Sequence, residues 1–213
     1  MKHIPHVVVP APWTERRMEL SVVQWRHMTR VMRLKSGAQL TYTDGLGTIG
    51  SGSLSHQSIE RGDEETVPRP TSLTVAVAPP SNKDRQRFLV EKLTELGVEK
   101  LVWLKTKHGA NRPASSPKVF SWIVNAVEQS QGAWLMEVAL DMLEMSELEG
   151  RVVVCDREGD RRVPDNVDVV AIGPEGGFAE GEIPSHLPLW GLGPTVLRVE
   201  TAAVVATARL GIR

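Results

Sequence analysis

Apolar and polar residues are arranged differently on the two sides of residue 70. On the N-terminal side, short apolar stretches are separated by turn signals such as Asp44-Gly45, a pattern typical of strands joined by tight turns. Residues 24–33 predict a helical turn that places His27 and Arg30 near one face. The predicted strands are Val7–Val9, Leu20–Val23, Gln39–Thr43 and the Gly- and Ser-rich Ile49–Leu54, which we expect to be bent or bulged.

Residues 60–70, ERGDEETVPRP, are polar, acidic and interrupted by prolines. A segment of this composition is typical of a linker or a domain boundary. We therefore expect two domains, a small β-rich domain over residues 1–68 and a second domain over residues 71–213.

Beyond residue 70, apolar strands alternate with helical periods. Predicted strands are Leu73–Ala78, Leu101–Leu104, Val152–Val154 and Val167–Ile172, and predicted helices are Lys83–Leu96, which Gly97 would end, and Val119–Gln131. Strands that alternate with helices indicate a mainly parallel sheet, so the predicted fold class is α/β. From Thr201 onward the chain is apolar almost all round, which predicts a helix buried in its own domain or in a subunit interface.

Composition is that of a globular protein and restricts the chemistry. Of 213 residues, 41% are hydrophobic and 24% are charged, which argues against long disorder and coiled coil. Cys155 is the single cysteine, so an internal disulfide and cysteine-based zinc clusters are excluded, and a reducing, cytoplasmic location is expected. The N-terminal sequence MKHIPHVVVPAPW lacks the apolar core of a signal peptide, and no stretch of about 20 apolar residues predicts a membrane span.

Charge is unevenly distributed, although the net charge is only −1. Residues 1–40 hold seven Lys and Arg against two Asp and Glu, and residues 83–118 hold nine against four. Residues 119–213 hold seven against fifteen. Basic surfaces on a nearly neutral chain can bind phosphates, although such clusters are also common on solvated surfaces, so charge alone permits a nucleic-acid partner without requiring one.

The segment Ile172–Phe178, IGPEGGF, follows a predicted strand and precedes a polar segment that we expect to be helical. Adjacent glycines let backbone N–H groups approach a ligand closely, although a plain tight turn also accounts for them. The segment is neither GxGxxG nor a Walker loop, so it does not support dinucleotide or nucleoside-triphosphate binding.

A second Gly-Pro loop, Leu192–Arg198 (LGPTVLR), leads into Glu200, Thr201 and the apolar C-terminal helix. Glu200 or Thr201 can cap that helix. Arg198 is flanked by apolar residues, and a half-buried guanidinium needs a partner. That partner is Glu200 or Glu175 in a structural role, or a phosphate or carboxylate of a ligand.

These two loops, GPEGG followed by LGPxVLRxETA, resemble those of the small-subunit ribosomal RNA (uracil-N3)-methyltransferases, a family of the SPOUT class. Further segments agree with the family in the same order along nearly the whole chain. They are Arg30–Gly37 followed by Asp44-Gly45, Lys92–Val98 (KLTELGV) and Glu128–Ser130 (EQS). Each motif is modest alone, and together they are specific.

The resemblance implies an N-terminal PUA-like β-barrel that holds RNA and an α/β domain whose chain threads a trefoil knot. It also implies that S-adenosylmethionine is the cofactor and that a uridine of small-subunit (16S) ribosomal RNA is methylated at N3. The partners would be ribosomal RNA or the small ribosomal subunit and a second copy of the chain in a homodimer. No metal is expected, since the six His are scattered without zinc-ligand spacing.

The resemblance also assigns individual residues. Those expected to bind the cofactor are Ile172, Gly173, Glu175, Gly176, Gly177, Leu192, Gly193, Val196, Leu197, Arg198 and Thr201, together with Asp156, which is either at the cofactor crevice or a plain loop acid. Those expected to contact RNA are His27, Arg30, Arg33, Lys35, Lys83, Arg85 and Arg112.

Methylation at N3 requires that the base leave its stack and that N3 lose its proton. Arg198, held by Glu200 or Glu175, would stabilise the uracil anion. Glu175 is one candidate for the base that takes the proton, and direct loss of the proton to water is the other.

The chain departs from the family pattern in places. Gln131-Gly132-Ala133 follows EQS where the family usually has Gly-Arg, Lys107-His108 stands in a segment where the family tends to an acid–arginine pair, and Val199 replaces a hydroxyl residue. Lys105, Lys107 or Arg112 can replace missing arginines as point charges. The sequence leaves open an enzyme with a shifted RNA target, an RNA-binding protein with a degenerate catalytic site and a small-metabolite binding module.

Overall fold

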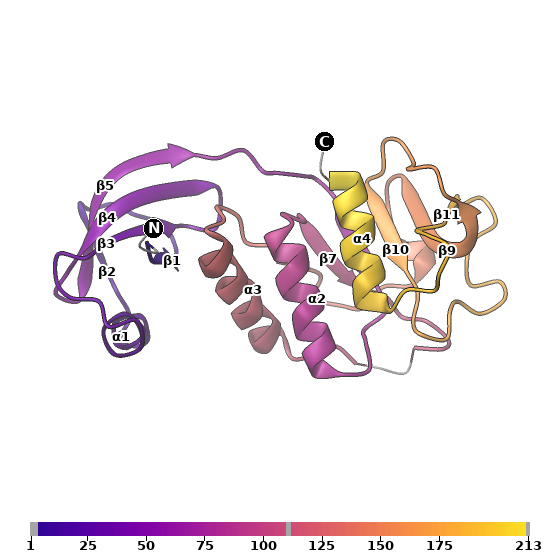
Figure 1. Cartoon of the computed structure of the whole chain (residues 1–213), viewed down its shortest axis with the longest axis horizontal. Helices are drawn as coiled ribbons and strands as arrows, with labels where there is room; N and C mark the ends of the chain where they lie inside the picture. The colour runs from indigo at the N-terminus through magenta and orange to yellow at the C-terminus, as the bar shows by residue number, and fades with distance from the viewer. Residues whose placement is uncertain (1–3, 110–111, 212–213) are drawn as a thin grey trace. The chain divides into compact units, whose positions relative to one another are not determined.

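The computed structural model describes residues 4–109 and 112–211. The chain divides into two compact units (Figure 1). One unit runs up to Arg69 and includes Val127–Leu135, and the other consists of Pro70–Ala126 and the chain from Met136 onward. Each unit has its own sheet, so the two are described separately.

The first unit is built on a curled five-stranded sheet of order β1-β3-β4-β5-β2 (Figure 1). Its strands are β1 His6–Val8, β2 Arg17–Glu19, β3 Gln39–Thr43, β4 Thr48–Ser55 and β5 Ser58–Thr66. β1 runs parallel to β3, and the other pairs are antiparallel. Within residues 4–109, β1 and β2 are the two edges, so the sheet is a half-barrel where the resemblance implies a barrel.

The bulge predicted in Ile49–Leu54 is confirmed. The register of β4 against β5 shifts between Gly50 and Gly52. A side chain on Gly50 would collide with the ring of Tyr42, which is fully buried in the core of this unit. Glycine is required here because the aromatic ring lies directly against the strand backbone.

The strand predicted over Leu20–Val23 is wrong, because this segment begins a helix. Ser21 caps α1 (Val22–Arg26): its hydroxyl accepts from the Gln24 N–H, and the Gln24 side chain accepts from the Ser21 N–H. α1 continues into the π-helical turn η1 (His27–Val31), whose Met28 packs into the core. The helical turn predicted over residues 24–33 is therefore confirmed. The capping box of Ser21 and Gln24 stabilises a helix where the hydrophobic pattern predicted a strand.

The linker predicted over residues 60–70 is also wrong in part, because β5 continues to Thr66 and pairs with β4. Arg61 donates to both carboxylate oxygens of Glu64 at 2.7 and 2.8 Å, and the Tyr42 hydroxyl donates to Glu64 at 2.7 Å. Burial, followed by the hydrogen bond and charge of Glu64, raises the pKa of Tyr42 to about 12. Backbone pairing and polar contacts stabilise β5, so the hydrophobic pattern of the sequence does not predict this strand.

A distant segment, Val127–Leu135, completes the first unit. The Gly132 carbonyl accepts a hydrogen bond from His6 Nε2 at 3.0 Å. The Glu128 carboxylate accepts from the Val8 N–H at 3.2 Å, and the Trp134 indole donates to the Val67 carbonyl at 2.9 Å. These bonds tie β1 and the residues after β5 to the end of α3 and the loop that follows it.

The second unit is built on a six-stranded parallel sheet of order β11-β9-β10-β6-β7-β8. In chain order its elements are β6 Thr74–Val77, α2 Lys83–Glu95, β7 Lys100–Trp103, α3 Ser116–Ser130, β8 Glu137–Val138, η2 Met145–Glu147, β9 Val152–Asp160, β10 Val169–Ile172, β11 Leu189–Trp190 and α4 Val199–Gly211. The predicted α/β class and parallel sheet are confirmed. The four strands, the two helices and the C-terminal helix predicted after residue 70 are all present, with ends shifted by a few residues.

The central strands are apolar because both faces of the sheet are covered. All four residues of β10 are buried. One face carries α2 and α4, which pack against each other (Figure 1). The other face carries irregular segments, whose Leu143, Phe178 and Leu187 pack on the alternate residues of β6, β9 and β10.

The helix expected after Phe178 does not form. Residues 179–188 consist of turns and bends. Gly181, Pro184 and Pro188 interrupt any helical run, and the apolar residues Ile183 and Leu187 are used to cover the sheet instead. The long connection from β10 to β11 therefore contains no helix over residues 179–188.

Candidate functional site

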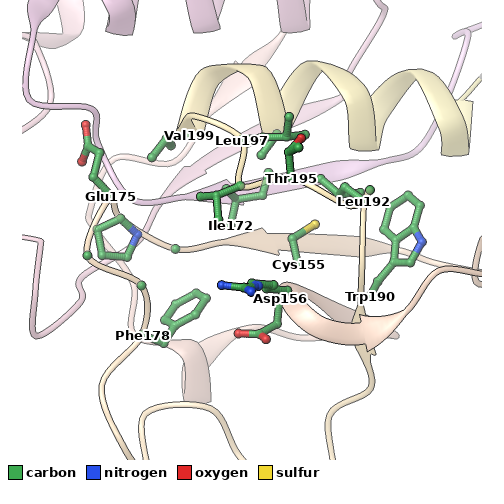
Figure 2. Close-up of a pocket in the computed structure, with 18 residues that line it drawn as sticks. Cys155, Asp156, Ile172, Glu175, Phe178, Trp190, Leu192, Thr195, Leu197 and Val199 are labelled. Atoms are coloured by element: carbon green, nitrogen blue, oxygen red, sulfur yellow. The ribbon is translucent and has the colours of Figure 1, made fainter.

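A cavity of about 300 Å³ lies beyond the end of β10, beside β9 and the start of α4 (Figure 2). Open parallel sheets commonly bind ligands at the carboxyl ends of their strands. The lining residues come from three segments of the second unit. They are Cys155, Asp156 and Arg157 of β9; Ile172, Gly173, Pro174, Glu175, Gly176, Gly177 and Phe178 after β10; and Trp190, Leu192, Gly193, Thr195, Val196, Leu197, Val199 and Ala202 from β11 to α4.

The two Gly-Pro loops singled out in the sequence thus face one cavity. Ten of the residues expected to bind the cofactor line it: Ile172, Gly173, Glu175, Gly176, Gly177, Leu192, Gly193, Val196, Leu197 and Asp156. Arg198 and Thr201 are not among the lining residues, and both side chains are exposed. Arg198 was expected to be half-buried, but it directly precedes α4, where its side chain faces solvent.

Glycine is required at two positions of the first loop, for a different structural reason at each. A Cβ on Gly173 would lie 2.9 Å from the Phe178 ring, so the ring is able to fold back on the loop only because Gly173 has no side chain. Gly177 has φ +72°, a left-handed conformation that side chains rarely adopt. By contrast, a Cβ on Gly193 would meet no atom within 4 Å, so this position is open toward solvent or the cavity.

Trp190 is a lining residue that the sequence reasoning missed. Its side chain is only 1% exposed, and its indole Nε1 is buried without a hydrogen-bond partner. The Arg209 guanidinium stacks 4.9 Å from the ring centroid and donates to the carbonyls of Leu192 and Arg161 at 3.2 and 2.9 Å. The indole nitrogen lies on the side of the ring turned away from the other labelled lining residues, so Trp190 gives the cavity the apolar part of its ring (Figure 2). With six tryptophans in the chain, no sequence signal distinguished this one.

Cys155 also lines the cavity and was missed as a site residue. Burial raises the pKa of its thiol to about 12. The neutral thiol therefore acts as an apolar wall rather than as a nucleophile. The other missed residues on the wall are Pro174, Phe178, Thr195, Val199, Ala202 and Arg157.

The carboxylates expected to hold Arg198 are held by Arg85 instead. Arg85 donates to both oxygens of Glu200 at 3.0 and 2.7 Å and to Glu175 at 2.8 Å. These three residues belong to α2, the loop after β10 and the first turn of α4. Arg85 was expected to contact RNA, but its guanidinium is already engaged by two carboxylates, a role that spacing along the chain did not reveal.

The Arg85–Glu200 contact is largely removed from solvent. The side chains are 23% and 9% exposed, whereas Glu175 is 39% exposed. Burial opposes ionisation of Glu200, yet its hydrogen bonds with Arg85 and the backbone and the charges of Arg85 and Arg198 hold the pKa of this carboxyl below its usual value. The hydrogen bond from Arg85 to Glu200 is the main reason that the pKa of Arg85 is raised. Bidentate geometry of this kind is the stronger form of an ion pair.

His108 is a second polar neighbour of the first loop that the sequence reasoning did not assign. Its Nδ1 lies 3.2 Å from the Gly177 carbonyl oxygen, and a Cβ on Gly176 would lie 3.4 Å from His108 Cβ. The imidazole is exposed. It stands in the Lys107-His108 pair that departs from the family pattern.

Four of the residues expected to contact RNA lie on the first unit, and their side chains are exposed. His27 and Arg30 belong to η1, and Arg33 and Lys35 follow it. Arg33 has φ +55°, so the chain turns sharply there. In the second unit, Lys83 and Arg112 are exposed. Their roles stay predictions.

In the part of the chain that the structure describes, no group of three or more His, Cys, Asp and Glu is arranged to hold a metal ion. Among the same residues, no helix is long and apolar enough to cross a membrane. The cavity therefore presents apolar walls and backbone groups of two glycine-containing loops, with Asp156, Arg157 and Glu175 also on its lining. Such a lining suits an organic ligand with both apolar and polar parts.

Residues 67–211 match a family described as an RNA methyltransferase domain. The chain belongs to this RNA methyltransferase family. Among its curated relatives is a ribosomal RNA small subunit methyltransferase E from Synechocystis, 26% identical, with an alignment that covers 96% of this chain and 76% of the relative. A protein of the same name from Mycobacterium bovis is 29% identical over 87% of this chain and 82% of its own.

Solved structures share the fold of this RNA methyltransferase. A probable rRNA-methyltransferase from Porphyromonas gingivalis superposes with a TM-score of 0.81 at 23% identity, covering 96% of both chains. A ribosomal RNA small subunit methyltransferase E from Neisseria gonorrhoeae, solved bound to S-adenosyl methionine, superposes with a TM-score of 0.80 at 23% identity over 97% of this chain and 96% of its own. The mixed α/β fold, with a curled sheet and a parallel sheet, is thus shared along nearly the full chain.

Proposed function

We propose that this protein uses S-adenosylmethionine to methylate N3 of a uridine in small-subunit ribosomal RNA. The observation that carries the proposal is that the two Gly-Pro loops, one before and one after β11, line one cavity at the end of β10. The names of the curated relatives supply the substrate class, and the resemblance of the loops supplies the N3 position.

The residues of the cavity fit this cofactor. Glycines of both loops line the cavity, so their backbone groups can pair with the polar atoms of the cofactor's adenine, ribose and amino-acid part. Ile172, Leu197 and the neutral Cys155 thiol give apolar surface for the rest. When bound, S-adenosylmethionine supplies a methyl group already activated by its sulfonium.

The chain's own task is to position uridine and to stabilise the charge that develops on it. The exposed cations His27, Arg30, Arg33 and Lys35 give the first unit a surface for RNA phosphates. Because Arg85 holds Glu200 and Glu175, the exposed Arg198 guanidinium is left available to the uracil anion. Arg198 then acts on the substrate rather than as part of the cavity wall.

The remaining parts of the proposal concern the assembly. The first unit is a PUA-like RNA-binding module, and the loops that line the cavity belong to a trefoil knot. Two copies of the chain form a homodimer with the active site near the interface. The enzyme acts in the cytoplasm, where its RNA substrate is made.

The test of the cofactor site is calorimetric titration with S-adenosylhomocysteine. We expect one site per chain. Gly193→Leu should lower the affinity at least tenfold, because the added side chain meets no protein atom within 4 Å of its Cβ and is free to fill the cavity. Ser185→Leu, an exposed change in a loop outside the cavity, is the matched control and should bind as the wild type does.

The substrate is tested by incubating the enzyme with unmodified small ribosomal subunits and, separately, with naked 16S RNA, followed by nucleoside mass spectrometry. N3-methyluridine supports the proposal. A different methylated nucleoside indicates a shifted target. Failure of the folded wild type to bind S-adenosylhomocysteine at millimolar concentration contradicts the enzyme and favours an RNA-binding protein without catalysis.

A further inference from the structure

We propose that His108 is the general base that removes the proton from uridine N3. The inference rests on the proposed function and adds a residue that neither the sequence motifs nor the comparisons assign. It starts from the contact between the His108 imidazole and the first cavity loop.

The contact selects one tautomer of the neutral ring. A carbonyl oxygen only accepts hydrogen bonds, so the 3.2 Å contact with the Gly177 carbonyl requires that Nδ1 of His108 carry the hydrogen. The lone pair of the neutral ring is then on Nε2. Histidines that act as bases are commonly oriented in this way, with one nitrogen bound to a backbone carbonyl and the other free to take a proton.

The position of the ring suits this role. Gly176 and Gly177 line the cavity, and His108 packs against both of them, with its own side chain exposed to solvent. Gly109 lies beside Pro174 of the same loop, since a Cβ on Gly109 would be 3.6 Å from it. His108 and Gly109 therefore pack against the loop that forms one wall of the cavity.

The competing base is weakened by its own contacts. Glu175 is the other proton acceptor proposed for this rim, but its carboxylate accepts a 2.8 Å hydrogen bond from Arg85. A carboxylate paired with a guanidinium is stabilised in its charged form and is a poorer base. His108, by contrast, has one nitrogen engaged by a neutral carbonyl.

Several charged groups belong to the segments around the ring. Lys105, Lys107 and Arg112 are on its own segment, Glu175 is on the cavity loop, and Glu182 accepts from the Lys107 N–H at 2.8 Å. An ordinary Lys, Arg or Glu side chain does not change its charge between pH 6 and 8, whereas histidine is the side chain that exchanges a proton in that range. The imidazole is therefore the group of this segment whose chemistry suits removal of the N3 proton.

The step balances without a further reactant. The N3–H proton passes to Nε2 of His108, which becomes imidazolium, and the N3 electron pair forms the bond to the methyl carbon. The bond between that carbon and sulfur breaks with its electrons on sulfur, which leaves S-adenosylhomocysteine. The imidazolium then returns its proton to water.

His108→Asn is the decisive variant, because the Asn amide is able to keep the donor toward the Gly177 carbonyl while removing the basic nitrogen. With saturating S-adenosylmethionine and small ribosomal subunits, we expect the single-turnover rate of N3-methyluridine formation to fall about 10²–10⁴-fold, the usual contribution of a general base. His186→Asn, at another exposed histidine of the same unit, is the control and should leave this rate unchanged.

Three readouts separate a catalytic role of His108 from a structural one. Affinity for S-adenosylhomocysteine should change less than twofold in His108→Asn, and imidazole added to His108→Ala should restore part of the rate. The ¹⁵N NMR shifts of the wild-type imidazole should show hydrogen on Nδ1 at pH 8.

A wild-type rate in His108→Asn, or hydrogen on Nε2 alone, overturns the proposal for His108 and leaves the proposed function intact. A wild-type enzyme that forms no N3-methyluridine overturns the proposed function itself, and the role of His108 with it.

Discussion

The buried imidazole of His6 shows how one residue can make folding depend on pH. Only 2% of His6 is exposed, and Nε2 donates to the Gly132 carbonyl at 3.0 Å while Nδ1 lies 2.8 Å from the Thr41 hydroxyl. The neutral ring satisfies both contacts by accepting at Nδ1. Burial lowers the pKa of His6, and the backbone hydrogen bond to Gly132 offsets this only in part.

Stability should therefore fall as the pH is lowered from the unfolded value of about 6.5 toward the lowered pKa of folded His6. In that range the unfolded chain binds a proton that the folded chain does not, so the free energy of unfolding decreases by up to about 1.4 kcal/mol per pH unit. Urea denaturation at pH 7.5 and 5.5 measures the loss, and His6→Gln should lose less over the same interval.

Glu128 is a second residue of the first unit whose shifted pKa makes the stability of the fold depend on pH. Burial raises the pKa of its carboxyl, so its contribution to stability is present at low pH and is lost as the pH rises through the raised value, opposite to that of His6. An equal pH dependence in wild type and His6→Gln would contradict the assignment to His6.

At the scale of single residues, the sequence predicted most of the residues that line the cavity but few of their contacts. Gly173, Gly177 and Gly193 were found because glycine next to proline after a strand is a visible pattern. The partners of Glu200 could not be found, because Arg85 is 115 positions away and only the packing of α2 on α4 brings them together. Trp190 and Cys155 carry no local signal, since their roles follow from burial alone.

At the scale of elements, Arg85 connects three of them. It joins α2 to the first turn of α4 through Glu200 and to the cavity loop through Glu175. Both carboxylates are bound by one guanidinium, so the loop and α4 are held in a fixed relation on the helix-covered side of the sheet. We expect the cavity to depend on this residue although Arg85 does not line it.

Arg85→Gln should lower the free energy of unfolding by about 1–3 kcal/mol, because it leaves the nearly buried Glu200 carboxylate without its cation. Affinity for S-adenosylhomocysteine should fall about fivefold to fiftyfold as the loop loses its anchor. Arg87→Gln, on the exposed face of the same helix, breaks only the surface pair with Glu91 and should leave both the free energy of unfolding and the affinity nearly unchanged. Equal effects of the two variants would show that Arg85 has no special role.

Elements were predictable where side chains bury along a regular period. β6, β7, β9 and β10 are runs of Val, Ala, Leu and Ile, and α2 ends at the glycine that the sequence indicated. The segments that the sequence did not predict correctly are determined by interactions other than periodic burial of side chains. Backbone pairing makes β5, a capping box at Ser21 makes α1, and prolines with glycine keep residues 179–188 out of a helix.

At the scale of the whole molecule, the exposed basic residues of the first unit and the cavity of the second serve separate steps in the proposed reaction. Arg30→Gln combined with Lys35→Gln should weaken RNA binding at all sequences and reduce the slope of log affinity against log salt by about 1–2, since each removed phosphate contact accounts for about 0.7–0.9. Affinity for S-adenosylhomocysteine should stay within twofold of the wild type.

The matched change is Arg17→Gln, which removes a cation already paired with Glu60 at 2.8 Å. It should leave the salt slope nearly unchanged. Fluorescence anisotropy with a labelled fragment of 16S RNA between 50 and 300 mM salt measures both variants. If Arg17→Gln flattens the slope as much as the double variant does, the RNA surface is not at η1.

The segment Val127–Leu135, which completes the first unit, has a consequence for how the protein is made. During translation, β1 to β5 leave the ribosome well before the residues that bond to His6, Val8 and Val67. At about 5–20 residues per second, the missing part arrives several seconds later. Until then the sheet has all five strands, but the polar groups that bond to Val127–Leu135 lack these partners, so we expect chaperones to bind the chain at this stage of its synthesis.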